Sequence, residues 1–254
     1  MSTSVMGDAV FQKQTPTARF DLNLLKSHFT MHYPCINKHN PLILASASPR
    51  RKRLLEQAGL PFRAVTSHVD EEIRYGSPEK TVCLLAEKKA FEVFPLAGGW
   101  ILGADTAVVI AASASQTMAK HSHTEEIILG KPRDAEDACR MLWLLSAQEH
   151  RVITGFCLLD PSGKSIHSEA VSTRVSIKKL TDREIDTYIR TNEPFGKAGS
   201  YAIQGIGSFM VKSIAGSYPN VVGLPLHALI KALISVGALK GFPLPGLSLP
   251  KDLG

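Results

Sequence analysis

One stretch near the start of the chain, residues 41–55 (PLILASASPRRKRLL), limits the folds open to it more than any other. Residues 42–44 form a short continuous apolar run, which is typical of a buried strand. Ser48-Pro49 predicts a helix start, because serine caps the first turn and proline, which lacks an N–H, suits the first helical position. Gly59 predicts the end of that helix. Such a junction presents unpaired N–H groups and the positive end of the helix dipole to a neighbouring molecule.

Four consecutive cations, Arg50, Arg51, Lys52 and Arg53, fall in or beside the first turn of this predicted helix. Cations oppose the positive end of the helix dipole, so the arrangement is unfavourable unless an anion binds there. A phosphate group would remove the conflict, because backbone N–H groups and guanidinium groups both bind its oxygens. Charge alone also allows a simpler interpretation, a solvated basic helix face.

The composition narrows the class of protein and of ligand. The 254 residues, 44% of them hydrophobic, suffice for one large domain or two small lobes with an apolar core. The net charge of +6 is a modest excess, which fits a polyphosphate ligand as well as a nucleic acid. Basic and aromatic residues do not interleave as they do in single-strand nucleic-acid platforms, so we do not expect a nucleic-acid partner.

The cysteines and the apolar runs predict a cytoplasmic protein. The four cysteines are far apart and show no paired spacing, which argues against a zinc site and a disulfide framework and favours a reducing compartment. The first residues lack the apolar core and the cleavage site of a secretory signal. No apolar run approaches the roughly 20 residues that span a bilayer, so we expect no membrane partner.

In a second informative stretch, residues 100–110 (WILGADTAVVI), the residues that would point to either face of a strand are mostly apolar. The stretch therefore predicts a central strand that is buried on both faces. Asp105 interrupts it. A lone carboxylate in such a strand is costly unless it is paired or bound to a cation. Two interpretations stay open: a structural aspartate satisfied by neighbouring N–H groups, or an acid that faces a cleft.

The remaining pattern predicts further strands and helices. Strands are expected at residues 62–65, 127–129, 152–159, 166–177, 201–204 and 209–214. Helices are expected to begin after Ser77, Asp134 and Thr181, each of which suits an N-cap, and the last helix is expected at residues 226–236. Residues 111–125 are predicted to be a flexible insertion, and residues 216–220 a loop.

A third stretch, residues 192–207 (NEPFGKAGSYAIQGIG), holds four glycines, a density that indicates tight turns or backbone close to a ligand. Lys197 offers a contact to phosphate, and Glu193 a contact to a metal or a water molecule. The amide of Gln204 can present both a donor and an acceptor to the edge of a base.

Five separated motifs now point to one family. They are SASPRR at residues 46–51, GADT at 103–106, GKP at 130–132, KAGSYAIQG at 197–205 and NVVGLPL at 220–226. In this order they resemble the Maf family of nucleoside triphosphate pyrophosphatases. The resemblance covers about residues 41–239 as one domain. Residues 1–40, an extension expected to be flexible, the insertion at 111–125 and a Pro/Gly-rich tail at 240–254 lie outside it.

The resemblance implies an α/β fold: an elongated mixed β-sheet flanked by helices, with two lobes and a central cleft, similar to inosine triphosphatase. It implies hydrolysis of the α–β phosphoanhydride of a nucleoside triphosphate to monophosphate and pyrophosphate, with a divalent cation such as Mg²⁺, Mn²⁺ or Co²⁺. Arg50, Thr106 and Gln204 match the branch that prefers dTTP and UTP and also accepts modified pyrimidine nucleotides. The other branch prefers 7-methyl-GTP and usually carries Glu-Gly at positions 204–205. Family members are often dimers, so the resemblance allows a homodimer.

The resemblance and the chemistry of the residues together give the expected site. Asp105 is the family's proposed general base and is also a candidate metal ligand, with Glu71 and Glu193 as further candidate ligands. The expected triphosphate contacts are Ser46, Ser48, Arg50 and Arg51, and the expected cations for the leaving pyrophosphate are Lys89, Lys131 and Lys197. Thr106 and Gln204 are expected to read the pyrimidine. Taken singly, Thr106 could equally be an ordinary strand residue, and Lys89 a solvated cation near the end of its helix.

Two rival functions stay open at this stage. The first is a non-enzymatic protein that binds nucleotide or nucleic acid and blocks septation, since septum inhibition gave the family its name. The second is a phosphatase or transferase that uses residues 46–51 as a bare anion site and releases orthophosphate. Pyrophosphate release from dTTP separates both from the pyrophosphatase.

Overall fold

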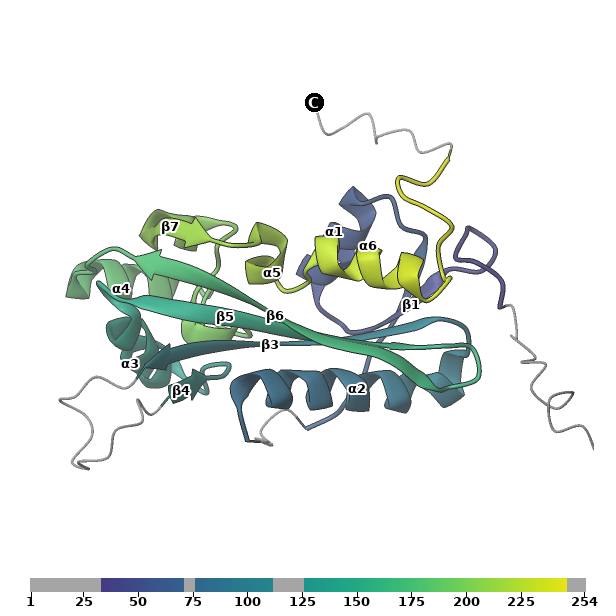
Figure 1. Ribbon diagram of the computed structural model, residues 1–254. Helices are drawn as coiled ribbons and strands as arrows, with labels where there is room; N and C mark the ends of the chain where they lie inside the picture. Colours follow the sequence, from purple (N-terminus) through teal and green to yellow (C-terminus); the bar gives the residue numbers. More distant parts are fainter. Residues whose placement is uncertain (1–32, 71–75, 112–125, 246–254) are drawn as a thin grey trace, which may run out of the picture. The chain divides into compact units, whose positions relative to one another are not determined.

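The computed structural model describes residues 33–70, 76–111 and 126–245, and within them a seven-stranded sheet (Figure 1). The strand order is β2-β1-β3-β5-β6-β7, and β4 pairs with β3. The strands are β1 (Leu42–Ala45), β2 (Phe62–Val65), β3 (Ile101–Ala111), β4 (Glu126–Leu129), β5 (Glu149–Leu159), β6 (Ser165–Ile177) and β7 (Val211–Ala215). Strand β1 runs parallel to β2 and β3, and the other pairs are antiparallel. The predicted mixed sheet is confirmed.

Helices cover both faces of the sheet (Figure 1). They are α1 (Pro49–Gln57), α2 (Pro78–Ala97), α3 (Ala135–Leu145), α4 (Asp182–Arg190), α5 (Tyr218–Val222) and α6 (Leu226–Ser235). Helix α2 packs on one face, where Ala86, Ala90 and Val93 meet Ile101 of β3. On the other face, one apolar core joins α1 and α6 to one end of β3, and a separate core joins α3 and α4 to its other end. These two cores are the two predicted lobes.

A gap along one edge of β3 determines where a ligand can approach the sheet. Strand β5 pairs with one edge of β3 along residues 101–109. On the other edge, β1 pairs with Ile101–Gly103 and β4 pairs with Val108–Ala111. Among the strands that the structure describes, none pairs with residues 104–107 on this second edge. The middle of a buried strand is therefore open from the side, between the two lobes.

Two glycines let α2 lie directly on the sheet beside this gap. A Cβ on Gly103 would lie 1.9 Å from the carbonyl oxygen of Ala86, and one on Gly155 would lie 2.5 Å from the carbonyl carbon of Val82. Gly155 is the cross-strand partner of Asp105. The absence of side chains at these two positions brings the backbone of α2 close enough for a side chain on α2 to reach the acid on β3.

The predicted helix starts are confirmed by their caps. The side chains of Ser48, Ser77 and Asp134 each accept a hydrogen bond from a backbone N–H in the first turn, and Thr181 forms a capping box with Glu184. The caps explain why these helices could be predicted, since each depends on residues three positions apart.

Three local predictions are wrong. Residues 201–204 form no strand, because glycines with positive φ at 199 and 205 bend the chain on both sides of them. Strand β7 begins at Val211 rather than at 209, since residues Ile206–Met210 form a 3₁₀-helix. The predicted loop at 216–220 contains the start of α5, where Ser217 caps a helix with proline in its first turn.

Part of the predicted extension packs against the domain. Ile36 is buried and donates its N–H to the oxygen of Ala238, and the indole Nε1 of Trp100 donates to the oxygen of Pro34. Residues 1–32, 71–75, 112–125 and 246–254 lie outside the described residues, so most of the predicted extension, insertion and tail does too. The domain boundaries remain predictions. No described helix is long and apolar enough to cross a membrane.

Candidate active site

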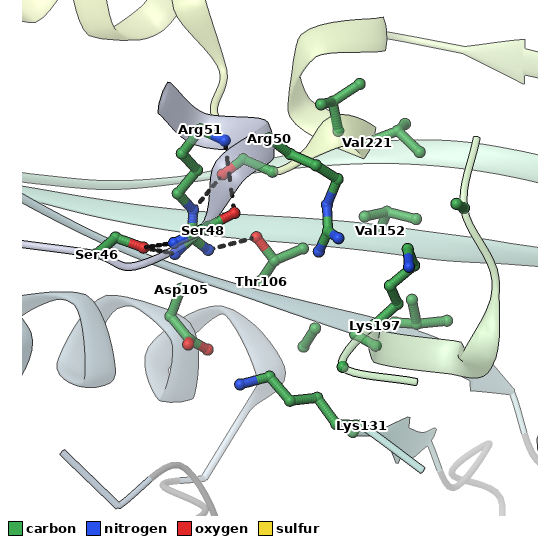
Figure 2. Close-up of a pocket in the computed structure, with 18 of the residues that line it drawn as sticks. Ser46, Ser48, Arg50, Arg51, Asp105, Thr106, Lys131, Val152, Lys197 and Val221 are labelled. Carbon is green, nitrogen blue, oxygen red and sulfur yellow. Dashed lines mark hydrogen bonds between the residues drawn. The ribbon is translucent and has the colours of Figure 1, made fainter. Parts of the chain in front are cut away.

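A cleft of about 880 Å³ opens at the gap in the edge of β3 (Figure 2). Its lining comes from the β1–α1 junction, the middle of β3, the GKP turn, the 196–204 loop and the end of α5. Most of the predicted site residues line it: Ser46, Ser48, Arg50, Arg51, Lys89, Asp105, Thr106, Lys131, Lys197 and Gln204. The structure thus brings together residues from four of the five motifs around the acid, and Val221–Gly223 of the fifth complete the lining.

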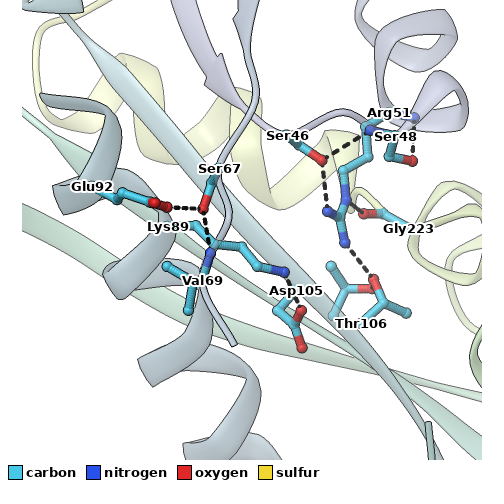
Figure 3. A network of polar contacts seen from close by, with 11 residues as sticks. Ser46, Ser48, Arg51, Ser67, Val69, Lys89, Glu92, Asp105, Thr106 and Gly223 are labelled. Atoms are coloured by element: carbon cyan, nitrogen blue, oxygen red, sulfur yellow. Dashed lines mark hydrogen bonds and ion pairs between the residues drawn. The ribbon is translucent and has the colours of Figure 1, made fainter. Parts of the chain in front are cut away.

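Asp105 and Lys89 form a buried ion pair beside the cleft (Figure 3). The Nζ of Lys89 lies 2.6 Å from Oδ1 of Asp105, and the two residues are 5% and 8% exposed. Burial of either charge alone would be costly, and the pairing offsets much of that cost. Lys89 is therefore not the solvated helix cation of the simpler interpretation. The carboxylate is held by a charged side chain rather than by neighbouring N–H groups.

Arg51 is buried and directs its guanidinium into the protein (Figure 3). Its Nε donates to the oxygen of Gly223 at 2.8 Å, Nη1 to Oγ of Ser46 at 3.1 Å and Nη2 to Oγ1 of Thr106 at 3.1 Å. One side chain thus ties the β1–α1 junction to β3 and to the turn after α5. This geometry favours a structural role for Arg51 over the direct triphosphate contact that the sequence predicts.

The hydroxyl groups near Arg51 also bind protein partners. Besides Arg51, Oγ1 of Thr106 contacts Oγ1 of Thr154 at 3.0 Å, and Thr154 in turn donates to the oxygen of Asn220. Oγ of Ser46 accepts the N–H of Ser48, whose own Oγ caps α1. The hydroxyl of Thr106 thus contacts two protein side chains, Arg51 and Thr154. The contact with the pyrimidine that the sequence predicts for it remains a prediction.

Several cations line the cleft, among them Arg50, Lys131 and Lys197. In Figure 2, Arg50 and Lys197 point toward the same space, and Lys131 points toward Asp105. Burial lowers the pKa of the Arg50 guanidinium. Burial also lowers the pKa of Lys197, and the neighbouring charge of Arg50 lowers it further, although Glu193 raises it. Partly buried like charges repel one another, so an anion between them would be stabilising.

The 196–204 loop is anchored to the sheet by His150 of β5. Its Nε2 lies 2.8 Å from the hydroxyl of Tyr201, and the two rings meet edge to face. Burial lowers the pKa of His150 to about 4. A neutral imidazole therefore supports this side of the cleft near neutral pH.

Glu193 does not line the cleft among the described residues. Its Oε1 accepts the N–H of Ile206 at 3.0 Å, and its Oε2 accepts the N–H of Gly207 at 2.7 Å. These contacts leave the predicted metal role of Glu193 without support from the geometry. The other candidate ligand, Glu71, lies outside the described residues.

The described residues contain no group of three or more His, Cys, Asp or Glu side chains that could hold a metal ion. Mg²⁺ and Mn²⁺ do not need such a group, because they often bind through one or two carboxylates and the phosphates of the substrate. Asp105, a carboxylate in the lining of a cleft that also holds several cations, fits that mode of binding.

Sequence reasoning missed Thr154 and Gly155 of β5. Thr154 contacts Thr106, and Gly155 makes room for α2 opposite Asp105. A signal was present, because a glycine inside an otherwise apolar strand often marks the close approach of another backbone.

The fold and the site together define a class: a mixed α/β protein whose cleft holds a buried acid–lysine pair and several further cations, suited to an anionic ligand. A family model described as Maf-like protein matches residues 41–236. The chain belongs to the Maf family.

Curated relatives from several organisms carry the same name. The dTTP/UTP pyrophosphatase of Syntrophotalea carbinolica is 46% identical over 206 residues, which cover 79% of this chain and 87% of that protein. The dTTP/UTP pyrophosphatase of Citrifermentans bemidjiense is 48% identical, covering 80% and 98%. That of Thermococcus onnurineus is 45% identical, covering 75% and 95%.

Proposed function

We propose that this protein is a nucleoside triphosphate pyrophosphatase that hydrolyses dTTP and UTP, and modified pyrimidine nucleotides, to the monophosphate and pyrophosphate. The observation that carries the proposal is the arrangement of Arg50, Lys131 and Lys197 around the buried Asp105–Lys89 pair in one cleft. The relatives named dTTP/UTP pyrophosphatase support the choice of substrate.

In this proposal, the triphosphate lies between the α1 N-terminus and the 196–204 loop. Arg50 and Lys197 bind the phosphate oxygens, and Lys131 neutralises charge that develops on the leaving pyrophosphate. Ser46 and Ser48 hold the junction in shape, so that its backbone can approach the phosphates. Binding the anion removes the repulsion between Arg50 and Lys197, which contributes to affinity.

Asp105 accepts the proton of the attacking water, a role that contributes roughly 10²–10⁴-fold to the rate of such reactions. Lys89 keeps the carboxylate in place and balances its charge. A divalent cation, Mg²⁺, Mn²⁺ or Co²⁺, would be held by Asp105 and phosphate oxygens, with Glu71 as a further candidate ligand, and would supply Lewis-acid polarisation of the phosphoryl group.

Gln204 selects the pyrimidine in this proposal. Its amide offers an N–H donor and an oxygen acceptor, which complement the carbonyl oxygen and the N3–H of uracil or thymine. A site that hydrogen-bonds both groups discriminates strongly against bases that lack one of them. Gln204 lines the same cleft as Arg50, which supports this assignment.

The four cysteines, none of them in a disulfide, and a nucleotide substrate support a cytoplasmic location. A homodimer is supported by the family resemblance, and light scattering of the purified chain would determine the oligomeric state.

The decisive experiment is a panel of nucleoside triphosphates, each with Mg²⁺, Mn²⁺ or Co²⁺, scored separately for pyrophosphate and orthophosphate. We expect pyrophosphate from dTTP and UTP and much less from purine nucleotides. Orthophosphate as the first product would favour the phosphatase alternative. Nucleotide binding without either product would favour the non-enzymatic binding protein.

A further inference from the structure

The turn that follows Gln204 is held by one carboxylate. Glu193, three residues after the end of α4, accepts the backbone N–H of Ile206 at 3.0 Å and that of Gly207 at 2.7 Å, each with a different oxygen. Burial raises the pKa of this carboxyl, but its interactions with these N–H groups and with the Tyr188 hydroxyl lower it below its usual value. Hydrogen bonds to an ionised acceptor are about twice as strong as those between neutral groups.

The same residue contacts the phosphate-binding side of the loop through its backbone. The carbonyl oxygen of Glu193 accepts a hydrogen bond from Nζ of Lys197. In addition, the Tyr188 hydroxyl accepts the N–H of Ala202, a residue that lines the cleft. Glu193 is therefore linked to the chain before Gln204 and to the chain after it.

The glycines of this turn fit the carboxylate closely. Gly205 has a φ of +91°, and a Cβ on it would lie 2.2 Å from Oε1 of Glu193. A Cβ on Gly207 would lie 2.5 Å from the hydroxyl of Tyr188. No side chain fits between the turn and the pair of polar groups that hold it, so these glycines are explained by Glu193 and Tyr188 rather than by direct ligand contact.

We propose that Glu193 is a positioning residue that fixes the base-reading Gln204 relative to the phosphate-binding Lys197, and thereby sets the substrate preference of the cleft. Its carboxylate holds the turn at one end of Gln204, and its carbonyl oxygen holds Lys197. Glu193 itself touches neither the substrate nor a metal. This inference rests on the proposed function.

The test compares Glu193→Gln with the intact enzyme. The substitution keeps the shape of the side chain but removes its charge. It also places an amide NH₂ group, which is a donor, against one of the two backbone N–H groups that now donate to the carboxylate. We expect the KM for dTTP and UTP to rise ten- to a hundredfold, kcat to fall less, and the preference for dTTP over dCTP to fall by a similar factor. The metal concentration that gives half-maximal activity should not change.

Glu184→Gln is the matched control. Glu184 lies on α4, the helix that precedes Glu193, and its carboxylate also accepts a backbone N–H, that of Thr181, but it does not line the cleft. It should leave both the KM and the substrate preference unchanged. Gly205→Ala provides a second route, because the added Cβ would push the carboxylate out of the turn, and it should reduce the preference for dTTP as Glu193→Gln does.

The outcomes separate this inference from the proposed function. If the intact enzyme releases no pyrophosphate from dTTP, the proposed function fails first. If the intact enzyme is active and Glu193→Gln retains its KM and its preference for dTTP, the positioning role is overturned. A higher metal requirement in Glu193→Gln would also overturn it, in favour of a metal ligand. Should Glu193→Gln fail to fold, an unchanged preference in Gly205→Ala would reject the inference.

Discussion

The two sides of the cleft are built in different ways. On one side, which we call the sheet wall, Ser46, Arg51, Asp105 and Thr106 belong to or adjoin regular elements, and buried polar groups join them. On the other, which we call the loop wall, residues 196–204 form turns and one short 3₁₀-helix, Ala198–Ser200, and side chains behind them, His150 and Tyr188, hold them in place. In the proposed function, the chemistry lies on the side built from regular elements, and substrate selection lies on the side that a few contacts hold in place.

The largest effect should come from the acid of the sheet wall. Asp105→Asn is expected to lower kcat for dTTP roughly 10²–10⁴-fold, because an amide cannot accept the proton of the attacking water. Circular dichroism should show an unchanged fold. Asp160→Asn is the matched control, since Asp160 is equally buried but caps the β5–β6 turn, away from the cleft. Substantial turnover by Asp105→Asn would remove the acid from the chemistry.

A substitution in the loop wall should change selection more than chemistry. Gln204→Glu replaces the amide donor with an acceptor, and we expect kcat/KM for dTTP and UTP to fall about ten- to a hundredfold. The unfolding midpoint should stay within a degree or two, because Gln204 is not buried. Initial rates over a set of nucleotides would test this. An unchanged substrate profile would mean that the loop wall does not read the base.

The neighbouring arginines of α1 allow a direct comparison of structure with binding. Arg51→Lys loses the three-way hydrogen bonding of a buried guanidinium, and we expect the free energy of unfolding to fall by about 2–4 kcal/mol. Arg50→Lys should change the free energy of unfolding by less than about 0.5 kcal/mol and should instead raise the KM. Urea unfolding and kinetics of both variants would check this. Equal losses of stability would contradict the inward role of Arg51.

The smallest effect should come from the anchor of the loop wall. Because burial lowers the pKa of His150 to about 4, the unfolded chain takes up a proton before the folded protein does as the pH falls. The contribution of His150 to stability is therefore fully present above about pH 6.5 and declines as the pH falls toward 4. When the pH falls from 7 to 5.5, the free energy of unfolding of the intact protein should decrease by about 1 kcal/mol more than that of His150→Phe. Equal pH dependence of the two in urea unfolding would rule out this contribution.

Local sequence patterns determined much of the fold. The apolar run of β1, the caps Ser48 and Ser77 and the doubly buried strand β3 depend on residues only a few positions apart. Such elements can be predicted without knowledge of the rest of the chain, because capping and hydrophobic periodicity depend on residues close together in the sequence. The same reasoning marked Asp105 as exceptional, since a lone acid in a buried strand needs a partner.

Only the tertiary structure decided which partner each polar group has. Lys89 reaches Asp105 because glycines bring α2 onto the sheet, and Glu193 faces Ile206 and Gly207, thirteen and fourteen residues further along the chain. Arg50 and Arg51 are adjacent and chemically identical, and both line the cleft, yet only Arg51 is buried with its guanidinium bound to Gly223, Ser46 and Thr106. The packing of α1 through Leu54 and Leu55 sets this difference, and packing depends on elements far away in the sequence.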